Sequence, residues 1–190
     1  MNDLLHIASH FLIKGTPVSV KPLGDGLIND TYKVITAGED TPDYVLQRIN
    51  TDIFTDVDML QRNIISVTGH IRSKLREAGE SDLSRKTLTV VMADDGKAYR
   101  REDGSCWRMT VFIPRARTFD TVDTAHSYSA GTAFGRFEAM LADIGEMPGE
   151  IIPDFHNMEL RLRQLDDAVT NDAAGRASGV RDLLGELERR

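Results

Sequence analysis

The most informative segment of the chain is Leu23-Gly-Asp-Gly-Leu-Ile-Asn-Asp-Thr-Tyr-Lys-Val34. Its glycines lie between two segments with strand-like patterns, Val18-Ser-Val20 and Thr31-Tyr-Lys-Val-Ile35. A Rossmann fingerprint or a Walker A loop needs a helix immediately afterwards, because the helix N-terminal amides bind the phosphate. The stretch therefore predicts a β-hairpin, either a plain tight turn or a glycine-rich flap that closes over phosphates.

The segments on both sides of this hairpin predict an α+β fold. Helices are expected at 4–13, 55–79 and 130–144, and strands at 18–20, 31–35, 44–49 and 105–113. The helix at 55–79 is predicted to begin with a capping box formed by Thr55 and Asp58. Asp95-Gly96 and Asp103-Gly104 predict turns that add one or two short strands. We expect an antiparallel sheet of about five strands with one long helix, followed only by helices.

Composition narrows the classes of partner. The 190 residues carry 23 basic and 30 acidic side chains, a formal net charge of -7, so a nucleic-acid partner is not expected. No apolar run approaches the roughly 20 residues of a membrane span, and no secretory signal is recognised. The single cysteine, Cys106, cannot form an intramolecular disulfide. We expect a cytoplasmic protein with no membrane partner.

The five histidines do not follow a zinc-binding motif. His6 and His10 lie four residues apart on the first expected helix, a spacing at which they could bind adventitious metal. No metal ligand is assigned. Cys106 lies next to Trp107 on an expected strand, so we expect a sheet residue in a reducing compartment and not a reactive thiol.

The order of segments resembles the aminoglycoside and choline phosphotransferase family, which is protein-kinase-like, and within it the N-acetylhexosamine 1-kinase branch. The resembling segments are Gly24-Asp-Gly-Leu-Ile-Asn-Asp-Thr-Tyr32, Tyr44-Val-Leu-Gln-Arg-Ile-Asn50, Asn63-Ile64, Val67-Thr68, Trp107-Arg-Met-Thr-Val-Phe-Ile113, Thr118-Phe-Asp120 and Ile152-Pro-Asp-Phe-His156. The resemblance implies a kinase-like N-lobe, ATP and Mg²⁺ as cofactors, and phosphoryl transfer to the anomeric hydroxyl of an N-acetylhexosamine.

The resemblance also implies which residues bind the ligands. Nucleotide-binding roles fall on Gly24, Asp25, Gly26, Asn29, Thr31, Gln47, Arg48, Asn63, Phe112, Ile113, Pro114 and Arg115, the last four forming the hinge beside the adenine. Asp154 and His156 are the residues implied for the sugar.

Two positions depart from the family pattern. The third strand usually ends in a Lys or Arg that binds phosphate, and here Gln47 stands there, followed by Arg48. Because strand residues alternate between faces, we expect Gln47 to face the cleft and Arg48 either to lie outside or to reach around to the nucleotide. The long helix offers Asn63 where kinases have a Glu, so an amide pair between Gln47 and Asn63 is expected.

The residues that perform phosphoryl transfer in this family do not occur in the chain, because no His is followed two positions later by Asp. We expect 1–114 to be the N-lobe and hinge and 115–190 an incomplete helical C-lobe of a longer kinase, inactive alone. An exposed apolar face, or a homo-oligomer that buries it, should follow. The alternatives are a non-catalytic nucleotide-binding or interaction module, and an unrelated α+β domain.

Overall fold

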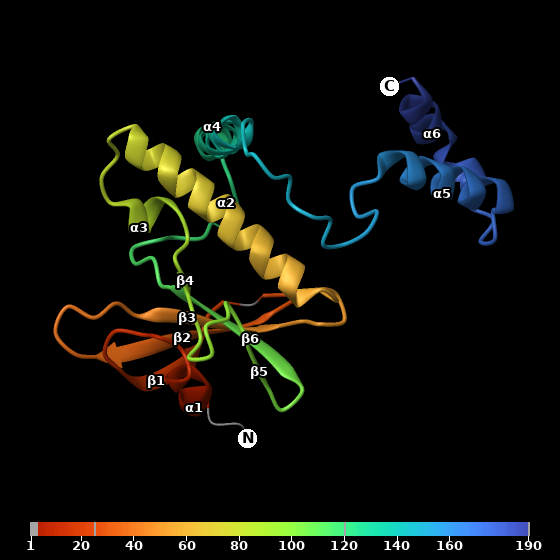
Figure 1. Cartoon of the computed structure of the whole chain (residues 1–190). Coiled ribbons are helices and arrows are strands. Elements are labelled where there is room, and N and C mark those ends of the chain that lie inside the picture. The colour runs from red at the N-terminus through yellow and green to blue at the C-terminus, as the bar shows by residue number, and fades with distance from the viewer. Residues whose placement is uncertain (1–3, 25, 120, 190) are drawn as a thin grey trace. The chain divides into compact units, whose positions relative to one another are not determined.

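A computed structural model describes residues 4–24, 26–119 and 121–189 (Figure 1). The chain divides into two compact units, Met1–Ile151 and Ile152–Arg190, and each is described by itself below. The boundary between lobes expected after residue 114 remains a prediction. The first unit holds the whole sheet and four helices among its described residues.

The first unit is built on an antiparallel sheet of six strands. Their bounds are β1 (Thr16–Pro22), β2 (Asp30–Ala37), β3 (Tyr44–Ile49), β4 (Val90–Val91), β5 (Arg100–Glu102) and β6 (Ser105–Val111). The sheet order is β1-β2-β3-β6-β4, and β5 also pairs with β6. The expected α+β class and antiparallel sheet are confirmed, with β4 and β5 as the two short strands.

The glycine-rich stretch forms the expected hairpin. β1 and β2 pair from Thr16 opposite Ala37 to Pro22 opposite Tyr32, with a shift in register between Pro17 and Ser19. The backbone N–H of Leu23 donates to the Thr31 carbonyl at 2.9 Å. The loop between the strands therefore spans the glycines. A flap or a tight turn, and not a strand-to-helix phosphate loop, is what the sequence encodes here.

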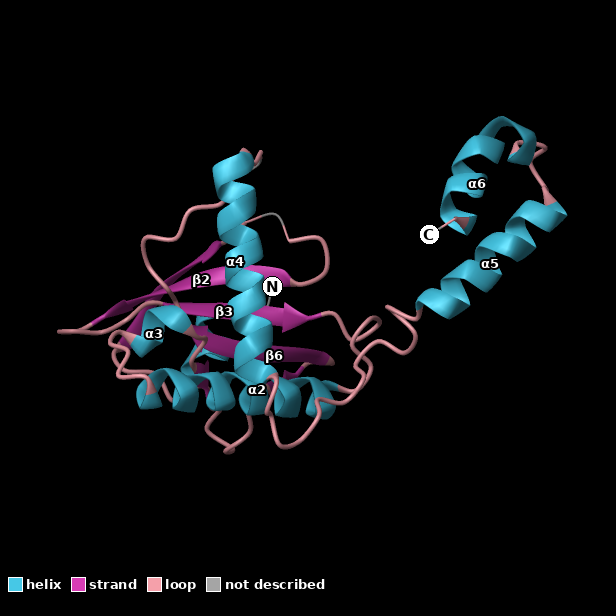
Figure 2. Ribbon diagram, turned by 90° about the horizontal axis from the view of Figure 1, so that it is seen from above, coloured by secondary structure: helices cyan, strands magenta, loops and turns pink. Residues whose placement is uncertain are grey.

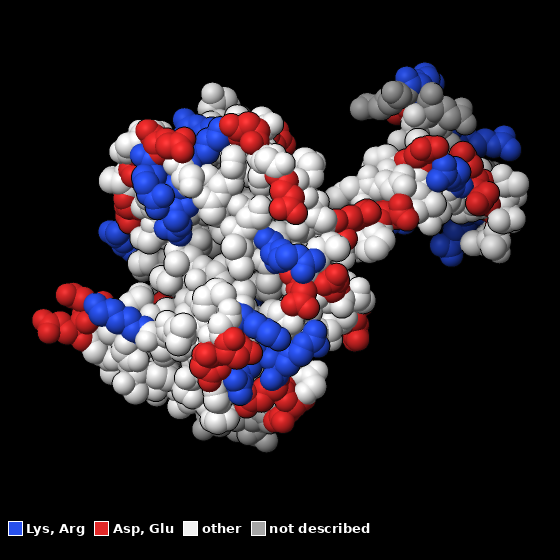
Figure 3. Space-filling view, viewed as in Figure 1, with Lys and Arg blue, Asp and Glu red and all other residues white. Residues whose placement is uncertain are grey.

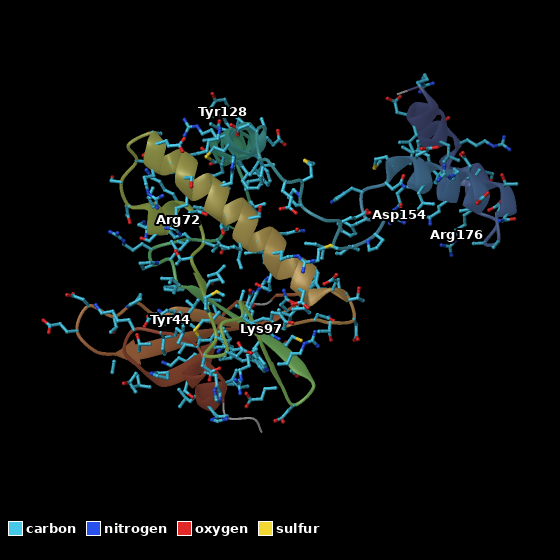
Figure 4. The ribbon with its side chains drawn as sticks, in the orientation of Figure 1. Tyr44, Arg72, Lys97, Tyr128, Asp154 and Arg176 are labelled. Atoms are coloured by element: carbon cyan, nitrogen blue, oxygen red, sulfur yellow. The ribbon has the colours of Figure 1, made fainter. Side chains whose placement is uncertain are left out.

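The sheet is covered by a helix on each face (Figures 1 and 2). On one side α1 (Leu4–Ser9) packs on a core that includes Leu46, Trp107 and Met109. Tyr44 belongs to the same core, and its hydroxyl accepts a 2.8 Å hydrogen bond from the Lys14 N–H (Figure 4). The central strands β3 and β6 contain only one charged side chain each, Arg48 and Arg108.

On the other face lies α2 (Val57–Glu77), the long helix that its apolar periodicity predicted. Val57 and Leu60 pack with Ile49, Tyr99 and Cys106 in a second core. The N-cap is Asp56, whose carboxylate accepts from the Met59 N–H at 2.8 Å, so the expected Thr55–Asp58 capping box is wrong. A carboxylate at this position also favours the positive end of the helix dipole.

The first helix is shorter than the expected 4–13, because the chain after Ser9 joins the sheet instead. Phe11 forms an isolated antiparallel bridge with Ala93, and the Leu12 N–H donates to the Met92 carbonyl at 2.8 Å. A short helix, α3 (Leu83–Lys86), leads from α2 towards β4. Sheet pairing of the backbone therefore overrides the helical pattern of this segment.

The helices that follow the sheet leave much of their apolar surface exposed. α4 (Thr124–Leu141) has no buried residue, and Tyr128 and Phe134 are 77% and 69% exposed (Figure 4). The second unit holds α5 (Met158–Asn171), η1 (Ala177–Val180) and α6 (Arg181–Glu188). The exposed apolar face expected after residue 115 is present on α4.

Two further observations concern the charged side chains on the surface and the apolar character of the helices. Acidic and basic side chains are interspersed on the face that Figure 3 shows, without a continuous basic area. None of the described helices combines the length and the apolar character needed to cross a membrane.

Candidate nucleotide site

A cavity of about 370 Å³ lies between the α2 face of the sheet and α2 itself. Its walls are mostly apolar, formed by Leu23, Val45, Ile64, Leu88 and Val90. The polar side chains that line it are Gln47 on β3, Gln61 on α2, and Arg108 and Thr110 on β6. An apolar pocket of this size with a few convergent polar groups is typical of a small-molecule site.

Three polar side chains form a chain of hydrogen bonds across three neighbouring strands. The register places Gln47 opposite both Thr31 on β2 and Arg108 on β6. Gln47 Nε2 donates to Thr31 Oγ1 at 2.9 Å, and Arg108 Nε donates to Gln47 Oε1 at 3.0 Å. The amide is thereby fixed in orientation from both sides.

Arg108 is a half-buried cation without an acidic partner among the described residues. Its only described side-chain hydrogen bond is the one from Nε to Gln47, so the N–H groups of its two terminal nitrogens are available to a ligand. Desolvation lowers the pKa of the Arg108 guanidinium from its ordinary value, although an arginine remains charged. An anion bound in the cavity would offset this cost of burial.

Gln61 adds a second unsatisfied donor to the same cavity. Its side chain is 3% exposed, and its Nε2 has no hydrogen-bond partner among the described residues. Leaving a buried amide unpaired costs about 1–3 kcal/mol. Native proteins rarely retain such a group without a ligand, water or ion that pairs it.

The glycine-rich loop borders this cavity through Leu23. Gly24 has a φ of +71°, a conformation that side chains other than glycine rarely adopt. Gly26 has little space beside it, since a Cβ there would lie 3.0 Å from the Asn29 carbonyl oxygen. Asn29 fixes the far end of the loop, because its Oδ1 accepts from the Asn50 N–H at 2.9 Å. Asp25 lies outside the described residues.

Only part of the expected hinge lines the cavity. Phe112 and Ile113 line the cavity, whereas Pro114 and Arg115 are exposed and do not belong to the lining. The Phe112 N–H donates to the Asp43 carbonyl, and the Pro114 carbonyl accepts from Arg85. Among the described residues, no hydrogen bond uses the Ile113 N–H. That donor is therefore available to a ligand at the edge of the cavity.

Gln47 and Arg48 lie on opposite faces of β3, as the alternation predicted. Gln47 lines the cavity, and Arg48 Nε donates to Asp30 Oδ2 at 2.6 Å on the other side of the sheet. The Arg48 side chain is 52% exposed. Its nucleotide-binding role remains a prediction without a contact to the cavity.

The expected amide pair between Gln47 and Asn63 is not formed. Asn63 Nδ2 donates to the Gly149 carbonyl at 2.7 Å, and Asn63 Oδ1 accepts from the Gly149 N–H at 3.0 Å. Both ends of this amide are thus used to hold the segment after α4. Gln61, two residues earlier, is the α2 amide that lines the cavity.

Asp154 and His156 belong to the second unit, Ile152–Arg190. Asp154 has a φ of +60° and accepts a 2.7 Å hydrogen bond from Asn157 Nδ2, next to the start of α5. The His156 ring packs edge-on against Phe155 with centroids 4.6 Å apart. Their role towards a sugar remains a prediction.

Sequence reasoning missed Arg108 and Gln61. Each had a signal: Arg108 alternates with Trp107 and Met109 on a strand, and Gln61 falls inside the apolar stripe of Val57, Leu60 and Ile64. A polar residue at an inward position is informative because it needs a buried partner.

Comparisons with known proteins bear on the fold. The sequence matches no protein-family profile. Among solved structures, the chain is similar to the crystal structure of spectinomycin phosphotransferase in complex with ADP and spectinomycin, with a TM-score of 0.47 and 10% sequence identity. The similarity covers 76% of this chain and 38% of that chain, so the chain spans well under half of the neighbour's length.

Proposed function

We propose that the cavity binds a purine nucleotide and that the chain is the nucleotide-binding part of a small-molecule kinase. The observation that carries the proposal is the half-buried Arg108, held by Gln47 in an otherwise apolar cavity beside a glycine-rich hairpin. A nucleotide matches this arrangement because it combines a flat apolar base with an anionic tail.

The residues would act on the nucleotide in three places. The apolar walls formed by Val45 and Ile64 would enclose the base, and the free N–H of Ile113 would donate to its edge. Arg108 would neutralise phosphate charge with its terminal nitrogens, and Gln47 would keep the guanidinium in position. The loop that begins at Gly24 would close over the phosphates.

The cavity does not provide the chemistry of phosphoryl transfer itself. None of the described lining residues is an Asp, Glu or His, so this cavity has no general base and no carboxylate for magnesium. We therefore assign no step to Mg²⁺ here. This observation favours binding without turnover by these 190 residues, whether the protein is a kinase or a non-catalytic nucleotide-binding module.

The acceptor follows from the family resemblance. We propose that the phosphoryl group is transferred to the anomeric hydroxyl of an N-acetylhexosamine, with Asp154 and His156 contributing to the sugar site. The described lining of the cavity supplies no carboxylate for this transfer.

Calorimetric titration with ATP, ADP, AMP and adenosine tests the nucleotide site. We expect ATP and ADP to bind more tightly than AMP, and adenosine to bind most weakly, because phosphates contact Arg108. Equal affinity for ATP and adenosine would contradict the role of Arg108, and absence of binding by all four ligands would reject the nucleotide site. Incubation with ATP and N-acetylglucosamine should give no sugar phosphate with this chain alone.

A further inference from the structure

Two histidines and a glutamate converge where α1 meets β5. His6 lies on α1, His10 follows its end, and Glu102 is the last residue of β5. His6 Nε2 lies 3.4 Å from His10 Nε2 and 3.4 Å from Glu102 Oε1. One nitrogen or oxygen atom from each of the three side chains lies within 4.8 Å of the other two. The cluster belongs to the α1 side of the sheet and shares no residue with the lining of the nucleotide cavity.

The hydrogen bonds around the cluster prepare His10 as a ligand. His10 Nδ1 lies 2.7 Å from Asp94 Oδ2. An ionised carboxylate only accepts hydrogen bonds, so Nδ1 carries the proton and Nε2 presents a lone pair towards His6. A carboxylate that orients a histidine through its second nitrogen is the usual outer partner of a metal-bound histidine.

Arg100 fixes the orientation of two carboxylates, those of Asp94 and Glu102. Arg100 Nη1 donates to Asp94 Oδ1 at 3.0 Å, and Arg100 Nε donates to Glu102 Oε2 at 2.9 Å. The second oxygen of Glu102, Oε1, is the atom that faces His6. The Glu102 side chain is 18% exposed, so its orientation is restricted by packing as well.

Two of the three separations between the ligand atoms fit tetrahedral zinc, and the third, between His10 and Glu102, is within 4.8 Å. With bonds of about 2.0–2.2 Å and tetrahedral angles, two ligand atoms of the same zinc ion lie about 3.3–3.5 Å apart. Both measured separations, His6 to His10 and His6 to Glu102, are 3.4 Å. His6 is 60% exposed, so solvent reaches the site and can supply a water as the fourth ligand.

We propose that His6, His10 and Glu102 bind one zinc ion, with Asp94 as the residue that orients His10. The bound ion would join α1 to β5 and so hold the N-terminal helix on the sheet. The competing explanation is a hydrogen-bonded cluster in which His6 donates to Glu102 and no metal binds.

Zinc titration of the tag-free, metal-depleted chain by calorimetry separates the two explanations. We expect one zinc per chain, and a rise in the midpoint of thermal unfolding on zinc addition, because only the folded state brings the ligands together. His10→Ala and Glu102→Gln should each lose most of the zinc affinity. Asp94→Asn should weaken zinc binding about 10- to 100-fold through the orientation of His10.

His126→Ala is the matched control, since His126 lies on α4, where it contacts Asp123 and not the cluster. It should bind zinc as the original chain does. Cobalt(II) in place of zinc should give the intense visible absorption of a four-coordinate ion. Absence of zinc binding, or equal affinity in the original chain and the His6→Ala/His10→Ala double variant, would overturn the proposal. A cobalt spectrum of the fully hydrated ion would overturn it too.

Discussion

Arg108 Nε donates a 3.0 Å hydrogen bond to Gln47 Oε1 across the β3–β6 pair. The two residues lie 61 positions apart in the sequence, and only the strand register brings them together. The kinase family has a cation at the position of Gln47, and here the structure places a cation, Arg108, on the neighbouring strand instead. The positive charge of the cavity is therefore supplied from β6.

Two substitutions of Gln47 separate its contribution to stability from its effect on the charge of the cavity. Gln47→Leu leaves Arg108 Nε without its acceptor, and we expect a loss of about 1–3 kcal/mol in the free energy of unfolding. Gln47→Glu keeps an acceptor for Arg108 and should retain stability, but its negative charge should weaken ATP binding. Urea unfolding and ATP titration measure the two effects. A Gln47→Leu chain as stable as the original would show that the bond contributes nothing.

Gln61 and Asn63 should behave in opposite ways. Gln61→Leu removes a buried unpaired amide, so the free chain should be as stable as before or more stable by up to about 1–3 kcal/mol, while nucleotide affinity falls. Asn63→Leu breaks both hydrogen bonds to Gly149, so stability should fall and nucleotide affinity should stay unchanged. Chemical unfolding and calorimetry on both variants test the pair. If Asn63→Leu weakened nucleotide binding and Gln61→Leu did not, Asn63 would be the residue that contacts the ligand.

The glycine at the start of the loop is expected to be required for its backbone conformation. Gly24 has a φ of +71°, and a Cβ added there would meet no atom within 4 Å, so Gly24→Ala should cost about 1–2 kcal/mol through the backbone alone. Gly69→Ala is the control, because Gly69 lies inside α2 without a positive φ and has equally open space. It should stabilise the chain by about 0.5–1 kcal/mol. Equal effects of the two substitutions would contradict this account of the loop.

Local sequence patterns predicted the parts of the fold that depend on local chemistry. The hairpin at Gly24, the opposite faces of Gln47 and Arg48, and the length of α2 all follow from turn chemistry, strand alternation and helical periodicity. The predicted end of the first helix, at residue 13, was wrong because Phe11 pairs with Ala93, and such a long-range contact cannot be seen in a local pattern.

The site required knowledge of register and helix phase. Arg108 reaches Gln47 only through the pairing of β3 with β6, which no local pattern specifies. Asn63 was chosen by analogy with a kinase glutamate, although the apolar stripe of α2 directs Gln61 towards the sheet instead. The helical periodicity of α2 by itself indicates Gln61, and not Asn63, as the residue that faces the sheet.

The contact between α2 and α4 should depend on pH. Lys74 and His70 on α2 contact Asp143, and the hydrogen bond from Lys74 holds the pKa of the Asp143 carboxyl below its ordinary value. A lowered folded-state pKa stabilises the fold above the unfolded-state pKa of about 3.9, and the contribution is lost as the pH falls through the lower value.

Asp143→Asn should therefore lower the midpoint of thermal unfolding at neutral pH and have no effect once the carboxyl is protonated. Glu138→Gln, on α4 five residues before Asp143, is the matched control and should show no such pH-dependent difference. Thermal unfolding from neutral to strongly acidic pH measures both. A difference between Asp143→Asn and the original chain that does not shrink with acid would contradict the ion pair.

The most direct test of the central claim compares ATP binding by two arginine variants in calorimetric titrations. Arg108 lines the cavity, and Arg48 lies on the adjacent strand but on the opposite face, paired with Asp30. We expect Arg108→Gln to weaken ATP binding by about 10- to 100-fold, the value of a hydrogen bond to a charged group, and Arg48→Gln to leave it unchanged. Unchanged ATP affinity in Arg108→Gln, in a chain that still folds, would contradict the assignment of the cavity as the phosphate-binding site.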